Sequence, residues 1–402
     1  MLEARDLTVE VGGRTTLWEA SFAVRAGDKV GLVGRNGAGK TSLLKVLAGE
    51  SEPAGGRAAV QGRLGFLTQD PRALRHLTDI TGLAHVLSGR GLDEAAERVE
   101  ALRRTMEADP SERAVARFSR AEDHFAALGG YAAEAEVRQL VAGLGLTADR
   151  IDLPIGVLSG GERRRVELAR ILFAGTDILM LDEPTNHLDI DAKSWLMGFL
   201  RDYRGALLVV SHDLDLLDDS ITRVLHLDEG ELVEYKGTYT QYREARVADE
   251  DRRRRLVTRQ QSEIKRLSDL ADSMRHQTAK RARIAKSLDK RVERMQSTAA
   301  TGPGRDRRYR VRFPEPPRAR RVVLEADGLG QAYGGPMIFE DVTFAVERGE
   351  RVLVMGLNGA GKTSLLRILA GRAEPKAGSH RTGLGVIPGY YAQEHEGIRR
   401  GA

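Results

Sequence analysis

Short apolar runs alternate with amphipathic segments through the first part of the chain. Residues 29–33, 178–181 and 206–210 are continuous apolar runs bounded by polar residues, which predicts buried strands, and residues 41–47 follow the first run with helical spacing. Strands that alternate with helices in this way are typical of a parallel sheet covered by helices. The pattern therefore predicts an α/β domain over residues 1–235.

Two further stretches have a helical pattern. Residues 93–144 are charged and predict a helical insertion into the α/β core, and residues 240–298 carry two apolar stripes at 3–4 spacing, which predict two long helices folded back on each other with a tip near residues 275–282. Glycine and proline in residues 300–318 indicate a linker. The two stripes are Leu256, Ile264, Leu267 and Met274, then Ile284, Leu288, Val292 and Met295.

The chain matches itself at an offset of 322 residues. GRNGAGKTSLLKVLAG at residues 34–49 returns as GLNGAGKTSLLRILAG at residues 356–371. This offset is too long for a short-repeat array and indicates a duplicated domain. The expected organisation is a first α/β domain over residues 1–235, a helical hairpin and linker over 236–321, and the N-terminal part of a second α/β domain over 322–402.

Charge is segregated along the chain. The net charge of the whole sequence is +5, but residues 252–321 hold 23 Lys and Arg against 7 Asp and Glu. A basic arm on an otherwise acidic body favours a polyanionic partner. The chain has no cysteine, no apolar segment at its start and no membrane-spanning run, so we expect a cytoplasmic protein without a membrane segment of its own.

Both repeats contain a phosphate-binding loop of the form G-x-x-x-x-G-K-S/T between a strand and a helix. The glycines let backbone N–H groups turn toward phosphate oxygens, and the following helix directs its positive end at the same charge. The lysine should contact the β- and γ-phosphates and the threonine should bind Mg²⁺. The expected ATP-binding residues are Gly34, Asn36, Gly37, Gly39, Lys40, Thr41 and Ser42, then Gly356, Asn358, Gly359, Gly361, Lys362, Thr363 and Ser364.

The apolar run at residues 178–181 ends in two carboxylates. Asp182 is expected to hold Mg²⁺, and Glu183 to act as the base that activates the attacking water. An ordinary acidic turn at a strand end would be the simpler interpretation of this motif in isolation. The phosphate-binding loop upstream favours the catalytic interpretation.

Further motifs resemble those of the ABC ATPases. Residues 158–162, LSGGE, resemble the signature that closes over the nucleotide of a partner domain, and residues 188–189 resemble the D-loop. Gln69 and Gln393 match the Q-loop glutamine, which implies contact with Mg²⁺, and His212 matches the switch histidine. The resemblance implies that Gln69, Glu183 and His212 are catalytic and that the signature contacts come from Ser159, Gly160, Gly161 and Glu162.

The string DEPTNHLD at residues 182–189 narrows the resemblance to the ABC-F subfamily. Two ABC domains on one chain joined by a basic helical hairpin are also similar to that subfamily. The resemblance implies a ribosome-associated ATPase whose hairpin reaches rRNA and P-site tRNA, as a translation factor or in antibiotic resistance. The hairpin side chains expected to bind RNA are Arg275, Lys280, Arg281, Arg283 and Lys286.

Two features depart from the family pattern. Tyr333 fits the aromatic residue that stacks on adenine, whereas the offset pairs it with Val11, which cannot stack. Residues 322–402 contain no second signature, acidic strand or switch histidine. We therefore expect this form to bind ATP but to hydrolyse it poorly as a monomer, to leave apolar surface uncovered, and to be able to pair its first domains as a homodimer; a fragment of a longer protein is the simplest explanation.

Other functions stay open at this point. A solvated helical spacer would also explain the hairpin. The energy-coupling subunit of a membrane transporter would explain every nucleotide motif but not the basic hairpin. A DNA-maintenance ATPase would explain the basic arm and would bind DNA instead of ribosomes.

Overall fold

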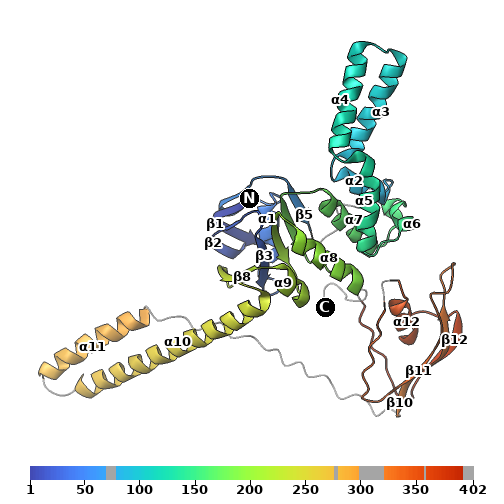
Figure 1. Cartoon of the computed structure of the whole chain (residues 1–402). Helices are drawn as coiled ribbons and strands as arrows, with labels where there is room; N and C mark the ends of the chain where they lie inside the picture. Colours follow the sequence, from blue (N-terminus) through green and yellow to red (C-terminus); the bar gives the residue numbers. More distant parts are fainter. Residues whose placement is uncertain (69–77, 276–278, 298–320, 357–358, 393–402) are drawn as a thin grey trace. The chain divides into compact units, whose positions relative to one another are not determined.

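A six-stranded sheet in the order β5-β6-β7-β3-β8-β9 forms the centre of the first part of the chain (Figure 1). All neighbouring strands are parallel except β9, which pairs antiparallel with β8 at one edge. The parallel α/β core expected from the sequence is therefore confirmed. The strands are β3 (Lys29–Gly34), β5 (Leu64–Leu67), β6 (Ile178–Asp182), β7 (Ala206–Val210), β8 (Arg223–Asp228) and β9 (Glu231–Lys236).

The computed structural model describes residues 1–68, 78–275, 279–297, 321–356 and 359–392. The chain divides into two compact units, Met1–Arg307 and Arg308–Ala402. Three of the site residues expected from the sequence, Gln69, Asn358 and Gln393, lie outside the described residues, as do the side chains of Arg275, Lys280 and Arg281.

An antiparallel sheet covers one face of the central sheet. It has the order β2-β1-β4, with β1 (Leu2–Val11), β2 (Arg14–Val24) and β4 (Gly55–Val60), and helix α1 (Lys40–Leu47) packs with both sheets in one hydrophobic cluster. Side chains of β6 alternate between the two faces of the central sheet. Ile178 and Met180 join this cluster, whereas Leu179 and Leu181 join the cluster on the opposite face. A strand buried on both faces reads as a continuous apolar run, which is why β6 was predictable.

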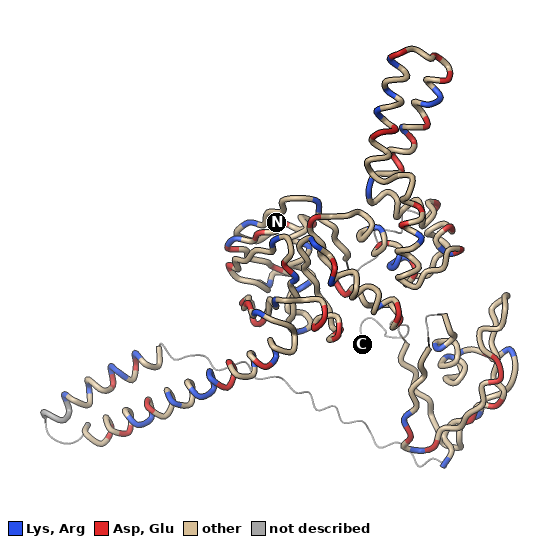
Figure 2. Tube along the Cα trace, viewed as in Figure 1, with Lys and Arg blue, Asp and Glu red and all other residues tan. Residues whose placement is uncertain are grey.

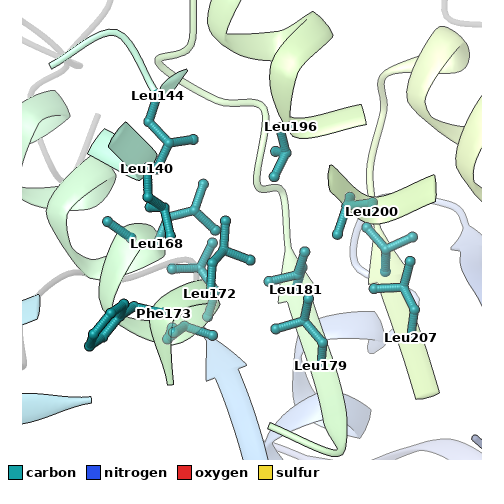
Figure 3. Close-up of a cluster of buried hydrophobic side chains, with 14 of the residues drawn as sticks. Leu140, Leu144, Leu168, Leu172, Phe173, Leu179, Leu181, Leu196, Leu200 and Leu207 are labelled. Atoms are coloured by element: carbon teal, nitrogen blue, oxygen red, sulfur yellow. The ribbon is translucent and has the colours of Figure 1, made fainter. Parts of the chain in front are cut away.

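Helices cover the opposite face of the central sheet. Figure 3 shows leucines of β6 and β7 meeting side chains of α5, α7 and α8. The helical segment begins earlier and continues further than residues 93–144. Its helices are α2 (Gly82–Ser88), α3 (Leu92–Ala108), α4 (Glu112–Ala127), α5 (Gly130–Gly143), α6 (Ala148–Ile151), the 3₁₀ turn η2 (Ile155–Val157) and α7 (Gly160–Phe173), followed by α8 (Ile190–Asp202) and α9 (Leu214–Ser220).

A long hairpin leaves this core after β9. Helix α10 (Tyr239–Arg275) and helix α11 (Ala279–Ser297) pack against each other, as the two apolar stripes predicted. The seam differs from the expected one, because Leu256 and Ile284 are exposed while Leu267, Ala271 and Ala285 are buried. Alanines let the two helices approach closely, and α11 is too short to cover α10 as far back as Leu256.

The second unit repeats the antiparallel part of the first. Strands β10 (Val322–Gln331), β11 (Phe339–Glu347) and β12 (Ala377–Thr382) take the order β11-β10-β12, and α12 (Lys362–Leu369) lies 322 residues after α1. Residues 351–356, which align with β3, are described but form no strand. Strand β3 pairs with β7 and β8, and Val30 within it is 0% exposed, whereas Val352 at the matching position of the second unit is 53% exposed.

Replacing either of two helical glycines by alanine should change stability, in opposite directions. A Cβ at Gly143 in α5 would lie 2.3 Å from the Trp195 ring, whereas a Cβ at Gly198 in α8 would meet nothing within 4 Å. Gly143→Ala should destabilise the first unit by about 1–3 kcal/mol through overpacking. Gly198→Ala should stabilise it by about 0.5–1 kcal/mol, because alanine restricts the unfolded chain. Thermal unfolding midpoints measure both; a midpoint for Gly143→Ala at or above that of Gly198→Ala would contradict the packing described.

Candidate nucleotide-binding site

The first phosphate-binding loop joins β3 to α1. Lys40 Nζ donates to the backbone oxygens of Gly34, at 2.8 Å, and Arg35, at 3.2 Å, so its side chain folds back over the loop. At two positions of the loop, neighbouring atoms lie too close for any residue larger than glycine. A Cβ at Gly34 would lie 2.4 Å from the backbone oxygen of Leu227, and Gly39 has a φ of 100° and would place a Cβ 2.7 Å from Thr16 Oγ1.

The second loop repeats this geometry in its own unit. Lys362 Nζ donates to Gly356 O at 2.8 Å, the same bond that Lys40 makes in the first copy. Gly359 and Gly361 both have a φ of 85°. Helix α12 begins at Lys362, so Thr363 is its second residue. The hydroxyl of Tyr333 donates to Ser364 Oγ at 3.3 Å, which places an aromatic residue beside the start of α12.

Two carboxylates lie buried at the end of β6. Asp182 is 1% exposed and Glu183 is 7% exposed. Glu183 has a φ of 51°, a left-handed conformation that is unfavourable for a side chain of this kind and is often found at functional sites. Arg164 of α7 fixes this turn, since its Nη2 donates to the backbone oxygens of Asp182 at 2.8 Å and Glu183 at 3.0 Å.

His212 follows β7 and lies against Glu183. The His212 backbone N–H donates to Glu183 Oε2 at 3.2 Å, and its ring Nε2 lies 3.4 Å from Glu183 Oε1. The Glu183 N–H in turn donates to Val210 O at 2.8 Å. The His212 side chain is 63% exposed and the Glu183 side chain only 9% exposed. The histidine therefore lies at the open side of the carboxylate, where a polyphosphate could reach it.

Burial is the largest cause of the pKa shifts of Asp182, Glu183 and Lys40. Burial raises the pKa of Asp182, although a hydrogen bond from Thr41 and the charges of Arg164 and Lys40 act in the opposite direction. Burial also raises the pKa of Glu183, against the effect of His212. Burial lowers the pKa of Lys40, while Glu183 and Asp182 act to raise it. A raised pKa makes Glu183 a better proton acceptor than an exposed glutamate.

These residues surround one cavity of about 550 Å³. Among the described residues, Asp182 Oδ2 is buried without a hydrogen-bond partner, and Thr41 lies beside the same carboxylate. An orphaned carboxylate oxygen next to a hydroxyl suits Mg²⁺, which prefers oxygen ligands and takes others from phosphates and water. The cavity is lined by Val11, Thr16, Asn36, Gly37, Gly39, Lys40, Thr41, Ser42, Asp182, Glu183, Asn186, Val210 and His212.

The signature segment lies elsewhere in the unit, outside the described lining of that cavity. Ser159 caps α7: its hydroxyl accepts from the Glu162 N–H at 3.3 Å, and Glu162 Oε2 accepts from the Ser159 N–H at 2.8 Å. Arg150 holds the same carboxylate through two bonds of 2.7 and 2.8 Å. Ser159 and Gly160 are exposed, so the N-terminal end of α7 is accessible at the surface of the unit.

Four lining or supporting residues were not among those expected from the sequence: Thr16, Asn186 and Val210, which line the cavity, and Arg164, which supports it. Thr16 lines the cavity from β2, and no motif marks it. Arg164 was detectable in principle, because it precedes buried Leu168, Ile171 and Leu172 by 4, 7 and 8 residues and so falls on the apolar face of α7. A buried arginine on such a face needs oxygen partners, and the carbonyls of the acidic turn supply them.

The fold and the cavity together define a class of protein. A parallel sheet with a phosphate-binding loop at the end of its central strand, an acidic pair on a nearby strand and a capped helix bearing LSGGE are the parts of an ABC-type nucleotide-binding domain. A protein-family model described as ABC transporter matches residues 17–186 and 339–387, and a second model with that description matches residues 225–313.

Relatives agree with that class. The chain is 31% identical over 395 residues to the probable ATP-binding protein YheS of Escherichia coli K12, covering 98% of this chain and 60% of YheS. It is 32% identical to the probable ATP-binding protein YbiT of Escherichia coli O157:H7, covering 98% and 74%. It is also 32% identical to the energy-dependent translational throttle protein EttA of Mycobacterium tuberculosis, covering 96% and 68%. The chain belongs to the ABC transporter family of ATP-binding proteins and is of the ABC-F type.

The chain spans about three fifths of the length of YheS. Within the described ranges, no helix is long and apolar enough to cross a membrane. The same part of the chain holds no group of three or more His, Cys, Asp or Glu that could bind a metal by itself.

The capping of α7 predicts a pH-dependent stability. Burial would raise the pKa of Glu162, but hydrogen bonds from Arg150 and Ser159 lower it to about 2. Because this folded pKa lies below that of an unfolded glutamate, the ionised side chain stabilises the fold above about pH 5, and the contribution is lost as the pH falls toward 2. Glu162→Gln should lower the thermal midpoint at pH 7 by roughly 3–6 °C.

The difference between Glu162→Gln and the parent should shrink as the pH is lowered from 5 to 3. Glu134→Gln is the matched control, because its carboxylate pairs with Arg138 on the surface of α5 and is 60% exposed. Its midpoint should change by less than about 1 °C. A Glu162→Gln deficit that stays constant across this pH range would show that the carboxylate charge does not stabilise α7.

Proposed function

We propose that this protein binds ATP with Mg²⁺ in the cavity of the first unit, hydrolyses it, and uses the nucleotide to control binding of its basic hairpin to the ribosome. The observation that carries the nucleotide part is the meeting of Lys40, Asp182, Glu183 and His212 around one cavity. Membership of the ABC transporter family and the similarity to EttA, whose name describes a translational throttle, support the whole proposal.

The chemistry follows from the positions of these groups. Lys40 and the N–H groups at the start of α1 would bind the β- and γ-phosphates. Thr41 and Asp182 would hold Mg²⁺, which supplies charge compensation on the phosphates when bound. Glu183, with its raised pKa, would take a proton from the attacking water, and His212 would contact the γ-phosphate from the open side.

Hydrolysis in this 402-residue form is proposed to be slow while the chain is monomeric. No residue of the signature segment is among those that line the cavity of its own unit, which supports the proposal that a second domain presents a signature there. Pairing of two first units would supply it. ATP turnover per chain that rises with protein concentration would indicate such pairing.

The basic residues of the hairpin support the proposed binding to ribosomal RNA, which is a polyanion. Figure 2 shows Lys and Arg positions, in blue, along both helices. Several acidic residues of α10 are already paired within that helix: Asp249 with Arg252, Glu250 with Arg246 and Arg254, and Glu263 with Arg266. On α11, five exposed basic side chains follow one another over three turns, which favours contact with RNA phosphates. They are Arg283, Lys286, Lys290, Arg291 and Arg294.

Ribosome co-sedimentation tests this function. Glu183→Gln protein should pellet with ribosomes in ATP and Mg²⁺ and stay in solution without nucleotide. Replacing Arg283, Lys286 and Lys290 by glutamine in that background should weaken binding about tenfold at moderate salt and reduce the slope of log affinity against log salt by about 2–3.

Arg113→Gln with Arg117→Gln is the matched control, since these exposed arginines lie on α4 and their loss should leave the salt slope unchanged. Absence of Glu183→Gln protein from the ribosome pellet, despite ATP binding measured by calorimetry, would contradict the ribosomal function and favour a transporter subunit. A preference for DNA over ribosomes in competition would favour DNA maintenance.

A further inference from the structure

Helix α9 lies between the nucleotide cavity and the hairpin. Its N-cap is Asp213, the residue after His212, and its side chain accepts the N–H of Leu216 at 3.2 Å. Leu216 and Leu217 are buried in the main core. The helix contacts α8 on one side and α10 on the other. A short helix that is anchored in the core by Leu216 and Leu217 and begins two residues after His212 can transmit a displacement of that residue as a rigid body.

An ion-pair cluster fixes the N-terminal end of α9. Lys193 Nζ of α8 lies 2.8 Å from a carboxylate oxygen of Asp213 and 2.8 Å from one of Asp215. Lys193 is one helical turn after Asp189, which caps α8 in the D-loop segment. The Lys193 and Asp213 side chains are 23% and 17% exposed, so this pair is less screened than a surface ion pair. The cluster joins the first turn of α8 to the residues beside His212.

A second contact fixes the other end of α9 to the hairpin. Asp218 Oδ1 accepts the backbone N–H of Thr240 at 2.7 Å, and Asp218 Oδ2 accepts the Thr240 hydroxyl at 2.7 Å. Thr240 is the second residue of α10, where backbone N–H groups have no partner within the helix. A carboxylate at this place makes charge-assisted bonds and also interacts favourably with the helix dipole.

The start of α10 also has a local contact, since Gln241 Oε1 accepts the Thr238 N–H at 3.1 Å. The contact from Asp218 is different in kind, because it comes from another helix. It attaches α10 to α9.

The rest of the hairpin root consists of aromatic contacts and one ion pair. Tyr242 of α10 is 4% exposed, and its ring centroid lies 5.5 Å from that of His226 on β8 and 5.1 Å from that of Tyr235 on β9. Arg246 Nη2 of α10 lies 3.5 Å from Asp228 Oδ2 at the end of β8. Aromatic packing and an ion pair of this length are less directional than the two 2.7 Å hydrogen bonds of Asp218, so Asp218 is the contact that sets the direction of α10. Because α10 has 37 residues and so a length of about 55 Å, each degree of rotation moves its far end by about 1 Å.

We propose that Lys193 and Asp218 are positioning residues that join the two ends of α9 to α8 and α10, so that a nucleotide contacting His212 changes the direction of the hairpin. This inference rests on the proposed binding of ATP in the first unit and deepens it by naming how the hairpin responds. Neither residue lines the cavity, and each acts through α9.

Distance measurement between two spin labels tests the coupling in the full chain. The sequence has no cysteine, so Ser51→Cys in the body and Gln261→Cys on α10 label uniquely. Both positions are exposed. Addition of a non-hydrolysable ATP analogue with Mg²⁺ should shift the interspin distance by about 2–4 Å, as expected for a rotation of a few degrees acting on roughly 33 Å of helix.

Asp218→Ala should abolish that nucleotide-dependent shift, and Lys193→Ala should reduce it. Asp218→Asn should retain part of it, because an amide can still accept from the Thr240 N–H. Asp219→Ala is the matched control: it removes a neighbouring exposed carboxylate and should leave the shift intact. Affinity for the ATP analogue should stay within about twofold in all four variants, a readout that separates coupling from loss of the cavity.

Three outcomes are decisive. A full shift in Asp218→Ala overturns the inference, and so does the absence of any shift in the parent while calorimetry shows the analogue bound. Absence of analogue binding to the parent contradicts the proposed nucleotide function itself. The measurement contains no ribosomes, so failure of the ribosomal proposal leaves its result unaffected.

Discussion

Burial of two adjacent carboxylates at the end of β6 is the constraint on which the rest of this structure depends. Ionised Asp182 and Glu183 are costly in a core unless cations and hydrogen-bond donors surround them. The surrounding groups come from separate elements: Lys40 and Thr41 from α1, Arg164 from α7, and His212 from the segment before α9. Satisfying one acidic pair therefore brings the phosphate-binding loop, the signature helix and the switch segment to fixed places.

The same contacts connect the acidic pair to α7 on one side and to α9 on the other. Arg164 lies on the helix whose exposed N-terminus carries Ser159 and Gly160, so the acidic pair and the signature are joined by one rigid helix. His212 leads directly into α9, which contacts the root of the hairpin through Asp218. We therefore propose that a change of charge in the cavity reaches both the exposed end of α7 and the basic hairpin, through α7 and α9.

The sequence predicted features that depend on local chemistry. Loops at 34–41 and 356–363 and the strand ending at Asp182 follow from glycine spacing and continuous apolar runs, and the two helices of the hairpin follow from 3–4 periodicity. Long-range pairing was not predictable in this way. Arg164 and Asp218 find partners 18 or more residues away, at places set by the packing of whole elements. Leu256 was misassigned to the seam because periodicity does not report where a partner helix ends, and Ile284 because the neighbouring Ala285 takes the buried position.

Calorimetric titration with ATP, with and without Mg²⁺, tests the central claim that Asp182 makes this cavity a Mg²⁺-dependent nucleotide site. A Lys362→Ala background confines the signal to the first unit. Mg²⁺ should tighten ATP binding about tenfold or more, equivalent to about 1.4 kcal/mol, and Asp182→Asn should remove that gain without weakening binding in the absence of Mg²⁺. Asp191→Asn, an exposed change on α8, should keep the full gain. An undiminished Mg²⁺ effect in Asp182→Asn would contradict the account.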